Sequence, residues 1–339
     1  MLNSSTHVRA VLGALAAALA LTLTACSPST ASSPEPTPAA SETATPAPTP
    51  TETATPTPAP VIDTIDGVSV DGAFGEVPAL SFEPNFSIDQ TRQRTIIEGD
   101  AANPAITEAS IVENNYAGYN ARTGEKFDSS FDKGQAALMT LDRLVPGFSK
   151  SLLGHRAGDR VLMVIPGSEA YDSQNGSPDV GIAVGDTLIF VVDIIAVSVD
   201  TATGTPQSPS LPVTLGADAD GYPTVAIPAG AAQPTQRTVA TVIQGTQRGV
   251  AATDYLMVFY RSYSWRTGAL IEDKYAAPDS GALSDLIPDW KEGLVGVPIG
   301  SRVVIVAPDA YPDGQATPAV EAGESVVFVI DILFASSAA

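Results

Sequence analysis

The sequence predicts an α+β fold in which an antiparallel sheet with one short helix occurs twice. Three observations support this prediction: short β-branched segments bounded by Gly, Pro and Asp, a proline-opened amphipathic segment in each half, and an ordered internal repeat. The chain has 339 residues, which leaves room for two domains of ordinary size once its N-terminal segments are set aside.

The strand prediction rests on four apolar runs. Residues 161–165 and 303–306, together with the closing runs 188–195 and 326–333, are rich in Val and Ile, and some are apolar on both faces. Branching at Cβ favours extended backbone, and these runs are short. We therefore expect each half to be built mainly of strands.

A short helix is expected in each half where a proline begins an amphipathic segment. Pro146 suits the first helical turn, because its missing N–H has no partner there anyway. Phe148, Leu152 and Leu153 then fall on one face, and Gly154 can end the helix in the left-handed conformation. The second half repeats this pattern with Pro288, Trp290, Leu294, Val295 and Gly296.

The internal repeat consists of ordered matches along the chain. Residues 93–95 recur as 236–238, 116–124 as 260–268, 144–148 as 286–290, 170–171 as 310–311, and 188–195 as 326–333. The distance between matched residues drifts only from 144 to 138 positions, which indicates a duplication. We expect one domain over residues 61–200, a connector rich in Thr, Gly, Pro and Ser over 201–210, and a second domain over 211–335.

The N-terminus carries a predicted export signal. Residues 11–23 are almost wholly Ala, Leu, Val and Thr, a run too short to span a bilayer but typical of a signal-peptide core. The tetrad Leu23-Thr24-Ala25-Cys26 resembles the bacterial lipobox, whose Cys is lipidated and becomes the mature N-terminus. We expect residues 1–25 to be a signal peptide and Cys26 to anchor the protein to the extracytoplasmic face of the cell membrane. The alternatives are an ordinary secretory signal that happens to carry a Cys, or a weak buried helix.

Residues 26–60 form a predicted linker between the anchor and the folded part. The segment after Cys26 consists of Pro, Thr, Ala, Ser and a few Glu, without apolar periodicity. Repeated prolines remove backbone donors and favour polyproline II, so this segment cannot form a packed core. We interpret it as a stiff spacer, and the alternative is a disordered leader with no spacing role.

The composition argues against several partners and cofactors. The chain has 38 acidic and 17 basic side chains, a net charge of −21 and a pI near 4.2, which argues against nucleic-acid binding. One cysteine permits no intrachain disulfide and no cysteine-based zinc site, and two histidines leave little for a His-rich metal centre. We expect no metal, no cofactor and no nucleic acid, and a monomer.

An ordered series of residues in the first repeat closely resembles the FKBP-type peptidyl-prolyl isomerases. The series is Tyr116, Phe127-Asp128-Ser129-Ser130, Val145-Pro146-Gly147-Phe148, Ala170-Tyr171 and Leu188-Ile189-Phe190. The resemblance covers most of the first repeat. It implies two tandem FKBP-like domains, each a half-wrapped antiparallel sheet of five or six strands around one short helix.

The resemblance also implies an activity, the cis-trans isomerisation of X–Pro bonds. Rotation about an amide has a barrier of about 18–20 kcal/mol, and the two X–Pro forms differ by about 1 kcal/mol, so a catalyst needs only to favour the twisted amide. A twisted amide has lost resonance and much of its polarity, so a dry apolar cavity accepts it better than water accepts the planar form. By resemblance, the walls of this cavity are Tyr116, Phe127, Val145, Phe148 and Phe190, its rim is Asp128, and Tyr171 offers a hydroxyl to a carbonyl.

Each of these residues also has an alternative interpretation. Aromatic side chains on strands are often core residues, and Asp128 is equally suited to begin the turn before Ser129. Phe148 stands where the family usually has Trp, which makes the cavity floor smaller. Lys133 is expected to be a solvated charge.

The second repeat departs from the family pattern at the rim. Ile271-Glu272 replaces Phe127-Asp128, and Ser262 replaces Gly118. The residues expected to line a divergent, substrate-binding pocket are Tyr260, Ile271, Glu272, Ile287, Trp290, Tyr311 and Phe328. We expect this pocket to bind peptides with weak or no isomerase activity, and the alternative is a fully active second site.

Two classes of function follow from these residues. The first is an extracytoplasmic, lipid-anchored prolyl isomerase that assists the folding of secreted proteins. The second is a binding module in which two linked sites hold Pro-containing or unfolded secreted polypeptides without catalysis. The intact Phe127-Asp128 and Tyr171 favour the enzyme, and the altered rim of the second repeat favours the binding module.

Overall fold

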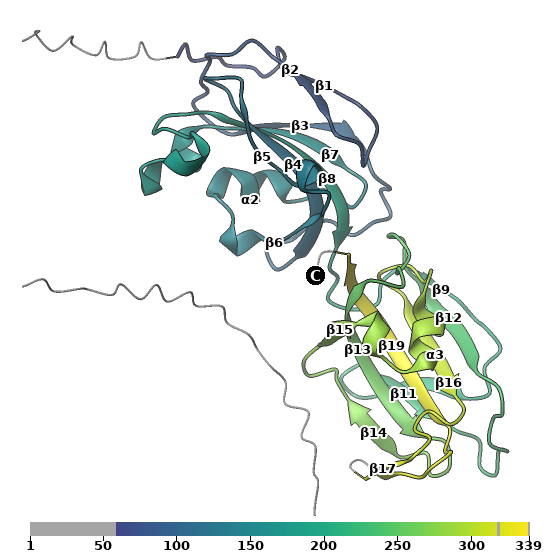
Figure 1. The fold of residues 1–339 in the computed structure, drawn as a ribbon. Coiled ribbons are helices and arrows are strands. Elements are labelled where there is room, and N and C mark those ends of the chain that lie inside the picture. The colour runs from purple at the N-terminus through teal and green to yellow at the C-terminus, as the bar shows by residue number, and fades with distance from the viewer. Residues whose placement is uncertain (1–58, 317–318, 338–339) are drawn as a thin grey trace, which may run out of the picture. The chain divides into compact units, whose positions relative to one another are not determined.

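The computed structural model describes residues 59–316 and 319–337 (Figure 1). These residues belong to one compact unit. The predicted signal peptide, Cys26 and all but the last two residues of the predicted linker lie outside the described residues. Among the residues that are described, no helix is both long and apolar enough to cross a membrane.

The first repeat forms a six-stranded antiparallel sheet. In chain order, its strands are β3 (Arg92–Ile97), β4 (Ile111–Asn120), β5 (Lys126–Ser129), β6 (Ala137–Thr140), β7 (Arg160–Ile165) and β8 (Leu188–Val197). They lie in the order β3-β7-β8-β4-β5, and β6 also pairs with β4. The predicted strands at 161–165 and 188–195 are therefore β7 and β8, next to each other within the sheet.

The second repeat forms a seven-stranded antiparallel sheet. Its strands are β9 (Thr205–Pro206), β12 (Thr238–Gln244), β13 (Tyr255–Ser264), β14 (Leu270–Asp273), β15 (Asp279–Ala282), β16 (Arg302–Ala307) and β19 (Val326–Ser336). Their order is β14-β13-β19-β16-β12-β9, with β15 on β13. Apart from β9, this order matches the first sheet strand for strand, as a duplication predicts.

The segment expected to be a connector is partly built into the second sheet. Thr205 and Pro206 pair with the edge strand β12, although the composition of residues 201–210 suggested only a linker. Hydrogen bonds also join the repeats. The Gln247 side chain bonds both backbone groups of Val197 at 2.7–2.8 Å, and Arg248 donates to the buried Glu113 at 3.0 Å. The division into two separate domains stays a prediction.

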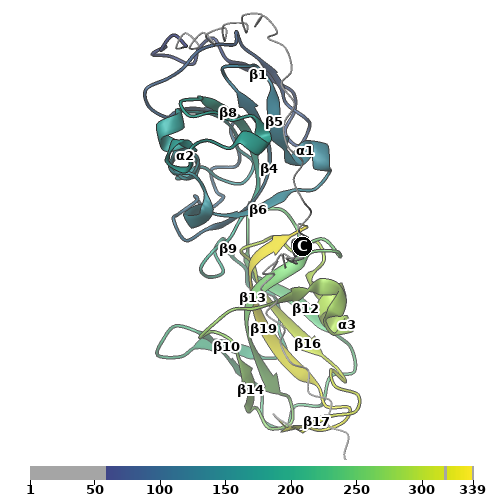
Figure 2. The ribbon, with the colours of Figure 1, turned by 60° about the vertical axis from the view of Figure 1, so that its left-hand side comes forward.

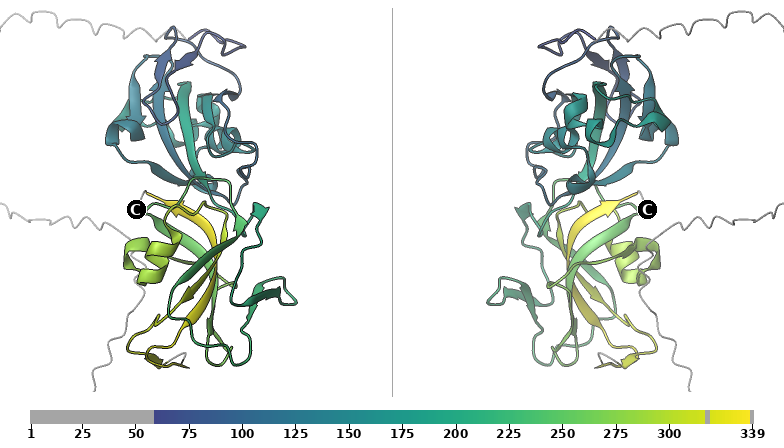
Figure 3. Two further views of the ribbon diagram at one scale, coloured as in Figure 1. Left: turned by 90° about the vertical axis from the view of Figure 1, so that its right-hand side faces the viewer. Right: turned by 90° about the vertical axis from the view of Figure 1, so that its left-hand side faces the viewer.

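Each sheet carries the expected short helix on one face (Figure 3). The helices are α2 (Pro146–Leu152) and α3 (Pro288–Leu294), and each begins at its proline. Gly154 and Gly296 have φ of +84° and +80°, as predicted. Leu153 and Val295 were expected on the buried face, but they are 39% and 47% exposed, because the backbone has already left the helical conformation there.

Further short helical segments occur that the sequence analysis did not predict. They are α1 (Ser130–Lys133) and the 3-10 turns η1 (Leu141–Arg143), η2 (Gly167–Glu169), η3 (Asp172–Gln174), η4 (Pro178–Val180) and η5 (Leu283–Asp285). Ser129 caps α1, because its hydroxyl accepts a hydrogen bond from the backbone N–H of Asp132. This cap explains why a helical turn directly follows β5.

A hairpin covers the other face of each main sheet. The hairpins are β1 (Ser69–Asp71) with β2 (Ala79–Ser81), and β10 (Thr214–Ala217) with β11 (Pro223–Ala226). In Figure 1, α2 lies below the first sheet and β1 and β2 lie above it, and in Figure 2, α3 and β10 lie on opposite sides of the second sheet. Another short pair, β17 (Gln315–Ala316) and β18 (Ala319–Val320), lies before β19.

This layering explains the strands that are apolar on both faces. In β7, Met163 belongs to the core beneath α2, whereas Leu162 packs with residues 62–88 on the opposite face. In β16, Ile305 packs with Trp290, and Val304 packs beneath the second hairpin. Each sheet is thus buried between a helix and a hairpin, and the site residues point toward the helix side.

Candidate functional site

The first repeat contains a cavity of about 360 Å³ between α2 and its sheet. Its lining residues are Tyr116, Phe127, Asp128, Met139, Arg143, Leu144, Val145, Pro146, Phe148, Ala170, Tyr171, Ser173, Gln174 and Phe190. All seven residues expected there from the sequence are among them. The structure therefore brings together side chains that span 74 positions of the chain, from Tyr116 to Phe190.

Three phenylalanine rings form the apolar part of this cavity. The Phe190 ring lies 5.0 Å from Phe148 and 5.6 Å from Phe127, and both pairs meet edge to face. Phe148 comes from the first turn of α2, Phe190 from β8 and Phe127 from β5. Edge-to-face contacts stabilise aromatic pairs beyond their buried area, so the three rings hold each other in place.

Gly118 makes room for these rings on β4. A Cβ atom at this position would lie 2.7 Å from Cζ of Phe127 and 2.9 Å from Cε1 of Phe190. Real Cβ atoms do not approach so closely. The absence of a side chain at Gly118 is therefore a requirement of the aromatic wall.

The rim of the cavity contains a hydrogen-bonded carboxylate, Asp128. Tyr116 donates its hydroxyl to Oδ2 at 2.5 Å, and Lys133 donates to Oδ1 at 2.7 Å. The backbone N–H of Ser129 also donates to Oδ1 at 2.9 Å, as expected of a turn-initiating Asp. Burial raises the pKa of Asp128, but the hydrogen bonds from Lys133 and Tyr116 outweigh it and hold the pKa below its ordinary value.

Tyr171 supplies a hydroxyl group at the cavity. It stands between η2 and η3, and its hydroxyl has no hydrogen-bond partner among the residues that the structure describes. Burial raises the pKa of Tyr171, and the charge of Asp128 raises it further. The hydroxyl therefore stays protonated near neutral pH and is free to donate to a ligand.

Two basic residues have contacts at this site that were not predicted. The Lys133 side chain is 62% exposed, as expected of a solvated charge, and it also pairs with Asp128 because α1 brings it back over the end of β5. Arg143, at the end of η1, lines the cavity although nothing in the sequence set it apart. Both depend on short helical turns, which the strand pattern did not indicate.

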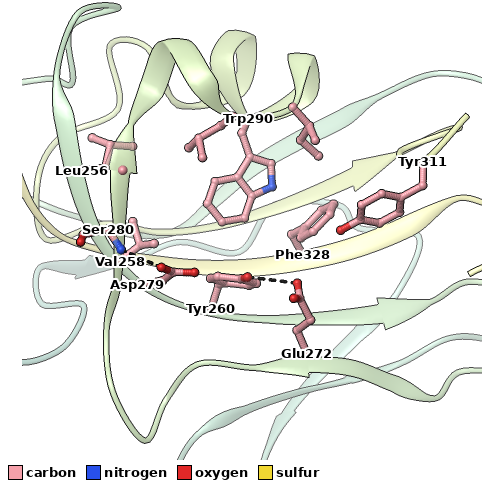
Figure 4. A pocket seen from close by; sticks show the side chains of 12 residues that line it. Leu256, Val258, Tyr260, Glu272, Asp279, Ser280, Trp290, Tyr311 and Phe328 are labelled. Carbon is pink, nitrogen blue, oxygen red and sulfur yellow. Dashed lines mark hydrogen bonds between the residues drawn. The ribbon is translucent and has the colours of Figure 1, made fainter. Parts of the chain in front are cut away.

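The second repeat contains the matching cavity, which has a volume of about 170 Å³ (Figure 4). Its lining residues are Leu256, Val258, Tyr260, Glu272, Asp279, Ser280, Gly281, Leu286, Ile287, Trp290, Tyr311 and Phe328. Six of the seven residues expected from the sequence line it. Asp279 and Ser280 on β15 were not foreseen, because no family motif marks that strand.

Ile271 is the residue that the prediction placed wrongly. It packs against the core but does not line the cavity. In the first repeat the ring of Phe127 reaches over Gly118, whereas the second repeat has the buried Ser262 at the position of Gly118. Isoleucine is shorter than phenylalanine, and its side chain does not reach the cavity.

The remaining geometry of the second cavity resembles that of the first. The Trp290 ring lies 5.1 Å from Tyr260 and 5.5 Å from Phe328, both edge to face. Tyr260 donates its hydroxyl to Glu272 at 3.0 Å (Figure 4). Burial raises the pKa of Tyr260, and the charge of Glu272 raises it further. The tyrosine–carboxylate pair of the rim is thus present in both repeats.

Comparisons with known proteins match this part of the chain. A family model described as FKBP-type peptidyl-prolyl cis-trans isomerase matches residues 103–195, which include all seven predicted residues of the first cavity. A probable FK506-binding protein of Corynebacterium glutamicum is 34% identical over 99 residues, 29% of this chain and 78% of the relative. An FK506-binding protein of Streptomyces anulatus is 34% identical over 106 residues, 31% of this chain and 83% of the relative. A crystal structure of a peptidyl-prolyl cis-trans isomerase from Pseudomonas syringae pv. tomato is 28% identical, with a TM-score of 0.29, over 32% of this chain and 76% of that chain.

Proposed function

Because the chain belongs to the FKBP-type peptidyl-prolyl cis-trans isomerases, we propose that its first cavity catalyses X–Pro isomerisation in secreted polypeptides outside the cytoplasm. The observation that carries this proposal is the aromatic cavity with Asp128 and Tyr171 at its edge. A proline ring fits an apolar cavity of this kind, and the amide before it then lies near the rim.

The residues of the cavity support a mechanism based on desolvation. Phe127, Phe148 and Phe190 present apolar surface to the twisted amide, whose carbonyl needs less solvation than that of the planar form. Tyr171 can donate one hydrogen bond to a peptide carbonyl and so orient the substrate. No proton enters or leaves the amide during rotation, so Asp128 acts by positioning Tyr116 and the rim rather than as an acid or base.

A matched pair of variants tests this proposal in the compact unit, residues 57–339. Phe127→Ala opens the first cavity to water, and we expect kcat/KM for a short Ala-Pro peptide to fall at least about tenfold in a protease-coupled assay. Ile271→Ala changes the corresponding residue of the second repeat and should leave kcat/KM within about twofold, because only the first cavity is proposed to catalyse. Equal losses in both variants would place catalysis in both repeats.

The proposed location rests on the lipobox-like tetrad before the Pro/Thr-rich segment. Lipidation of Cys26 would hold the enzyme at the outer face of the membrane, where secreted polypeptides emerge. Mass spectrometry of protein purified from membranes should find Cys26 acylated at the N-terminus. An unmodified Cys26, or a retained segment 1–25, contradicts this location.

A second function is proposed for the second cavity, namely peptide binding with little catalysis. Trp290, Tyr260 and Phe328 keep an aromatic cavity, but its volume is half that of the first and no aromatic residue stands at the position of Phe127. Proline peptides should therefore bind there while turnover stays in the first repeat. Titration of Trp290 fluorescence with a proline peptide tests this binding directly.

A further inference from the structure

The two cavities differ in charge. The first is lined by one carboxylate, Asp128, and by the guanidinium of Arg143, and Lys133 also pairs with Asp128. The second is lined by two carboxylates, Glu272 and Asp279, and none of its described lining residues is Lys, Arg or His. The first rim is therefore close to neutral, and the second is negative.

The strand registers show that this difference arises at matching positions. Glu272 faces Ser262 as Asp128 faces Gly118, so the first carboxylate is common to both repeats. Asp279 lies opposite Val258 on β13, and the matching position opposite Asn114 on β4 holds the uncharged Ala137. At the end of the following 3-10 turn, η1 ends in Arg143 and η5 ends in the exposed Asp285. Two positions have thus become acidic in the second repeat.

The negative charge of the second rim is only partly neutralised within the chain. Glu272 accepts a hydrogen bond from Tyr260, and no described cation pairs with it. Asp279 lies 3.9 Å from Nζ of Lys274, and these two side chains are 48% and 41% exposed. Such an exposed and distant pair contributes little, so both carboxylates can attract a further cation.

A second observation indicates that a ligand binds at this cavity. Trp290 is only 4% exposed, and its Nε1 has no hydrogen-bond partner among the described residues. Figure 4 places this nitrogen on the side of the ring that faces Phe328, within the set of side chains that line the cavity. The edge-to-face ring of Phe328 is only a weak acceptor for this N–H, and a peptide carbonyl in the cavity is a stronger one.

We propose that the second cavity selects proline segments in which Lys or Arg lies next to the proline. This inference rests on the proposed peptide binding by the second repeat and adds the class of peptide. The proline ring packs against Trp290, and the neighbouring cationic side chain reaches Glu272 and Asp279 at the rim. An acidic residue at the same place is repelled by both carboxylates. The first cavity, with Arg143 at its rim, has no such preference.

The chain offers a reporter for the second cavity alone. Its two tryptophans are Trp265 and Trp290. Trp265 packs on the hairpin side of the second sheet, away from the cavity, and the first cavity has Phe148 as its floor. Trp265→Phe in residues 57–339 therefore leaves a fluorescence signal that responds only to the second cavity. The protein with both tryptophans, titrated in parallel, verifies that this substitution has not altered binding.

The experiment compares three capped peptides without aromatic residues, Ala-Lys-Pro-Ala, Ala-Ala-Pro-Ala and Ala-Glu-Pro-Ala. At low salt the lysine peptide should bind about tenfold or more tightly than the glutamate peptide, with the alanine peptide between them. This ratio should shrink to about two- or threefold in 0.5 M salt, where the Debye length is about 4 Å. A peptide with arginine in place of the lysine should bind with a similar affinity and a similar salt dependence.

Paired variants assign the selectivity to the rim. Glu272→Gln with Asp279→Asn should reduce the ratio of the two dissociation constants to about 1. Glu83→Gln with Asp220→Asn removes the same charge from two exposed residues that line neither cavity, and it should keep the ratio. Equal binding of all three peptides overturns the charge selection and leaves the proposed peptide binding intact. Failure of every peptide to change Trp290 fluorescence overturns the peptide binding itself, and the selection with it.

Discussion

The first and second cavities lie at the same place in two copies of one fold, yet they differ in volume, wall and charge. The first measures about 360 Å³ and the second about 170 Å³. Their floors are Phe148 and Trp290, and the larger indole accounts for part of the smaller volume. In the first repeat Phe127 stands over Gly118 on the side wall, whereas the matching residues of the second repeat, Ile271 and Ser262, do not line its cavity.

The features that stay the same are those that build the rim and floor. A tyrosine hydroxyl donates to a carboxylate in both repeats, from Tyr116 to Asp128 and from Tyr260 to Glu272. An aromatic ring from the proline-opened helix lies against a phenylalanine of the last strand in both. The comparison indicates that the aromatic floor suffices to form a cavity, while the wall residue Phe127 with Gly118 distinguishes the proposed catalytic site from the proposed binding site.

The largest expected effect is on stability, and it concerns a buried arginine–aspartate ion pair that occurs at the same place in both repeats. Arg160 bonds Asp193 with both side chains fully buried, and Arg302 bonds Asp331 in the same register with the arginine 19% exposed. Arg160→Met leaves the carboxylate of Asp193 buried and unpaired, so the free energy of unfolding should fall by about 3–5 kcal/mol. Urea unfolding followed by circular dichroism measures this loss.

Arg302→Met is the matched control for this comparison. Water can reach the more exposed site, so the loss should be smaller, about 1–3 kcal/mol. Arg160 also donates to the backbone carbonyls of Gly72 and Glu76 and so holds the first hairpin on the sheet. Equal losses of unfolding free energy in the two variants would mean that neither the deeper burial of the Arg160 pair nor its hairpin contacts add to stability.

The next effect tests the side wall that distinguishes the two cavities. Gly118→Ala puts a Cβ atom into the rings of Phe127 and Phe190, which must move apart. We expect kcat/KM to fall more than about tenfold and stability to fall by about 1–3 kcal/mol. Ser262→Ala at the matching position removes a buried hydroxyl that has no hydrogen-bond partner among the described residues, so it should be neutral or slightly stabilising. Full activity in Gly118→Ala would show that the rings of Phe127 and Phe190 can move apart without loss of catalysis.

Much of the fold could be predicted because local chemistry determines it. Pro146 and Gly154 mark the two ends of one helix, and β-branched runs mark the inner strands. The residues of the first cavity were predicted through an ordered motif rather than through any local pattern. Positions far apart in sequence, such as Phe127 and Phe190, meet only because β5 and β8 both pair with β4.

The features that could not be predicted depend on contacts over long distances. The strands β1, β2 and β10 are short and largely exposed, and β11 has only four residues, so these hairpins carry no clear strand pattern. Lys133 meets Asp128 only because a one-turn helix follows β5. Ile271 was misplaced because its side chain packs against the core and does not line the cavity, which the repeat alignment alone could not show.

A smaller effect is expected from the hydroxyl of Tyr171. Tyr171→Phe removes one donor and keeps the ring, and one hydrogen bond contributes about 0.5–1.5 kcal/mol, so kcat/KM should fall at most about tenfold. Tyr311→Phe, the corresponding change in the second repeat, should leave turnover unchanged to within about twofold if catalysis belongs to the first cavity. Both values come from the same protease-coupled assay. A loss far above tenfold for Tyr171→Phe would mean that this hydroxyl does more in catalysis than orient one carbonyl by a single hydrogen bond.

The smallest expected effect is that of pH on turnover, and it tests whether the first cavity works by desolvation alone. The pKa of Asp128 is held below its ordinary value, so this carboxylate stays charged at any pH well above that value. Burial raises the pKa values of Tyr116 and Tyr171, and the neighbouring Asp128 raises them further, so both hydroxyls stay protonated. No described lining residue of the cavity is a histidine. kcat/KM should therefore vary less than about twofold between pH 6 and 8.

The lowered pKa of Asp128 also predicts the pH range in which stability and activity should begin to fall. A carboxyl group whose pKa is lowered by folding contributes stability above its ordinary pKa, and this contribution is lost as the pH falls through the lowered value. Protonation of Asp128 should therefore lower stability and activity only in acid. Asp128→Asn should have a mild effect at pH 7 and should remove this loss of activity in acid. Protease-coupled rates from pH 4 to 8 in both proteins check this, with the protease itself calibrated at each pH. A bell-shaped profile near neutrality, or loss of all activity in Asp128→Asn while Phe127→Ala stays active, would replace desolvation with acid–base catalysis at the rim.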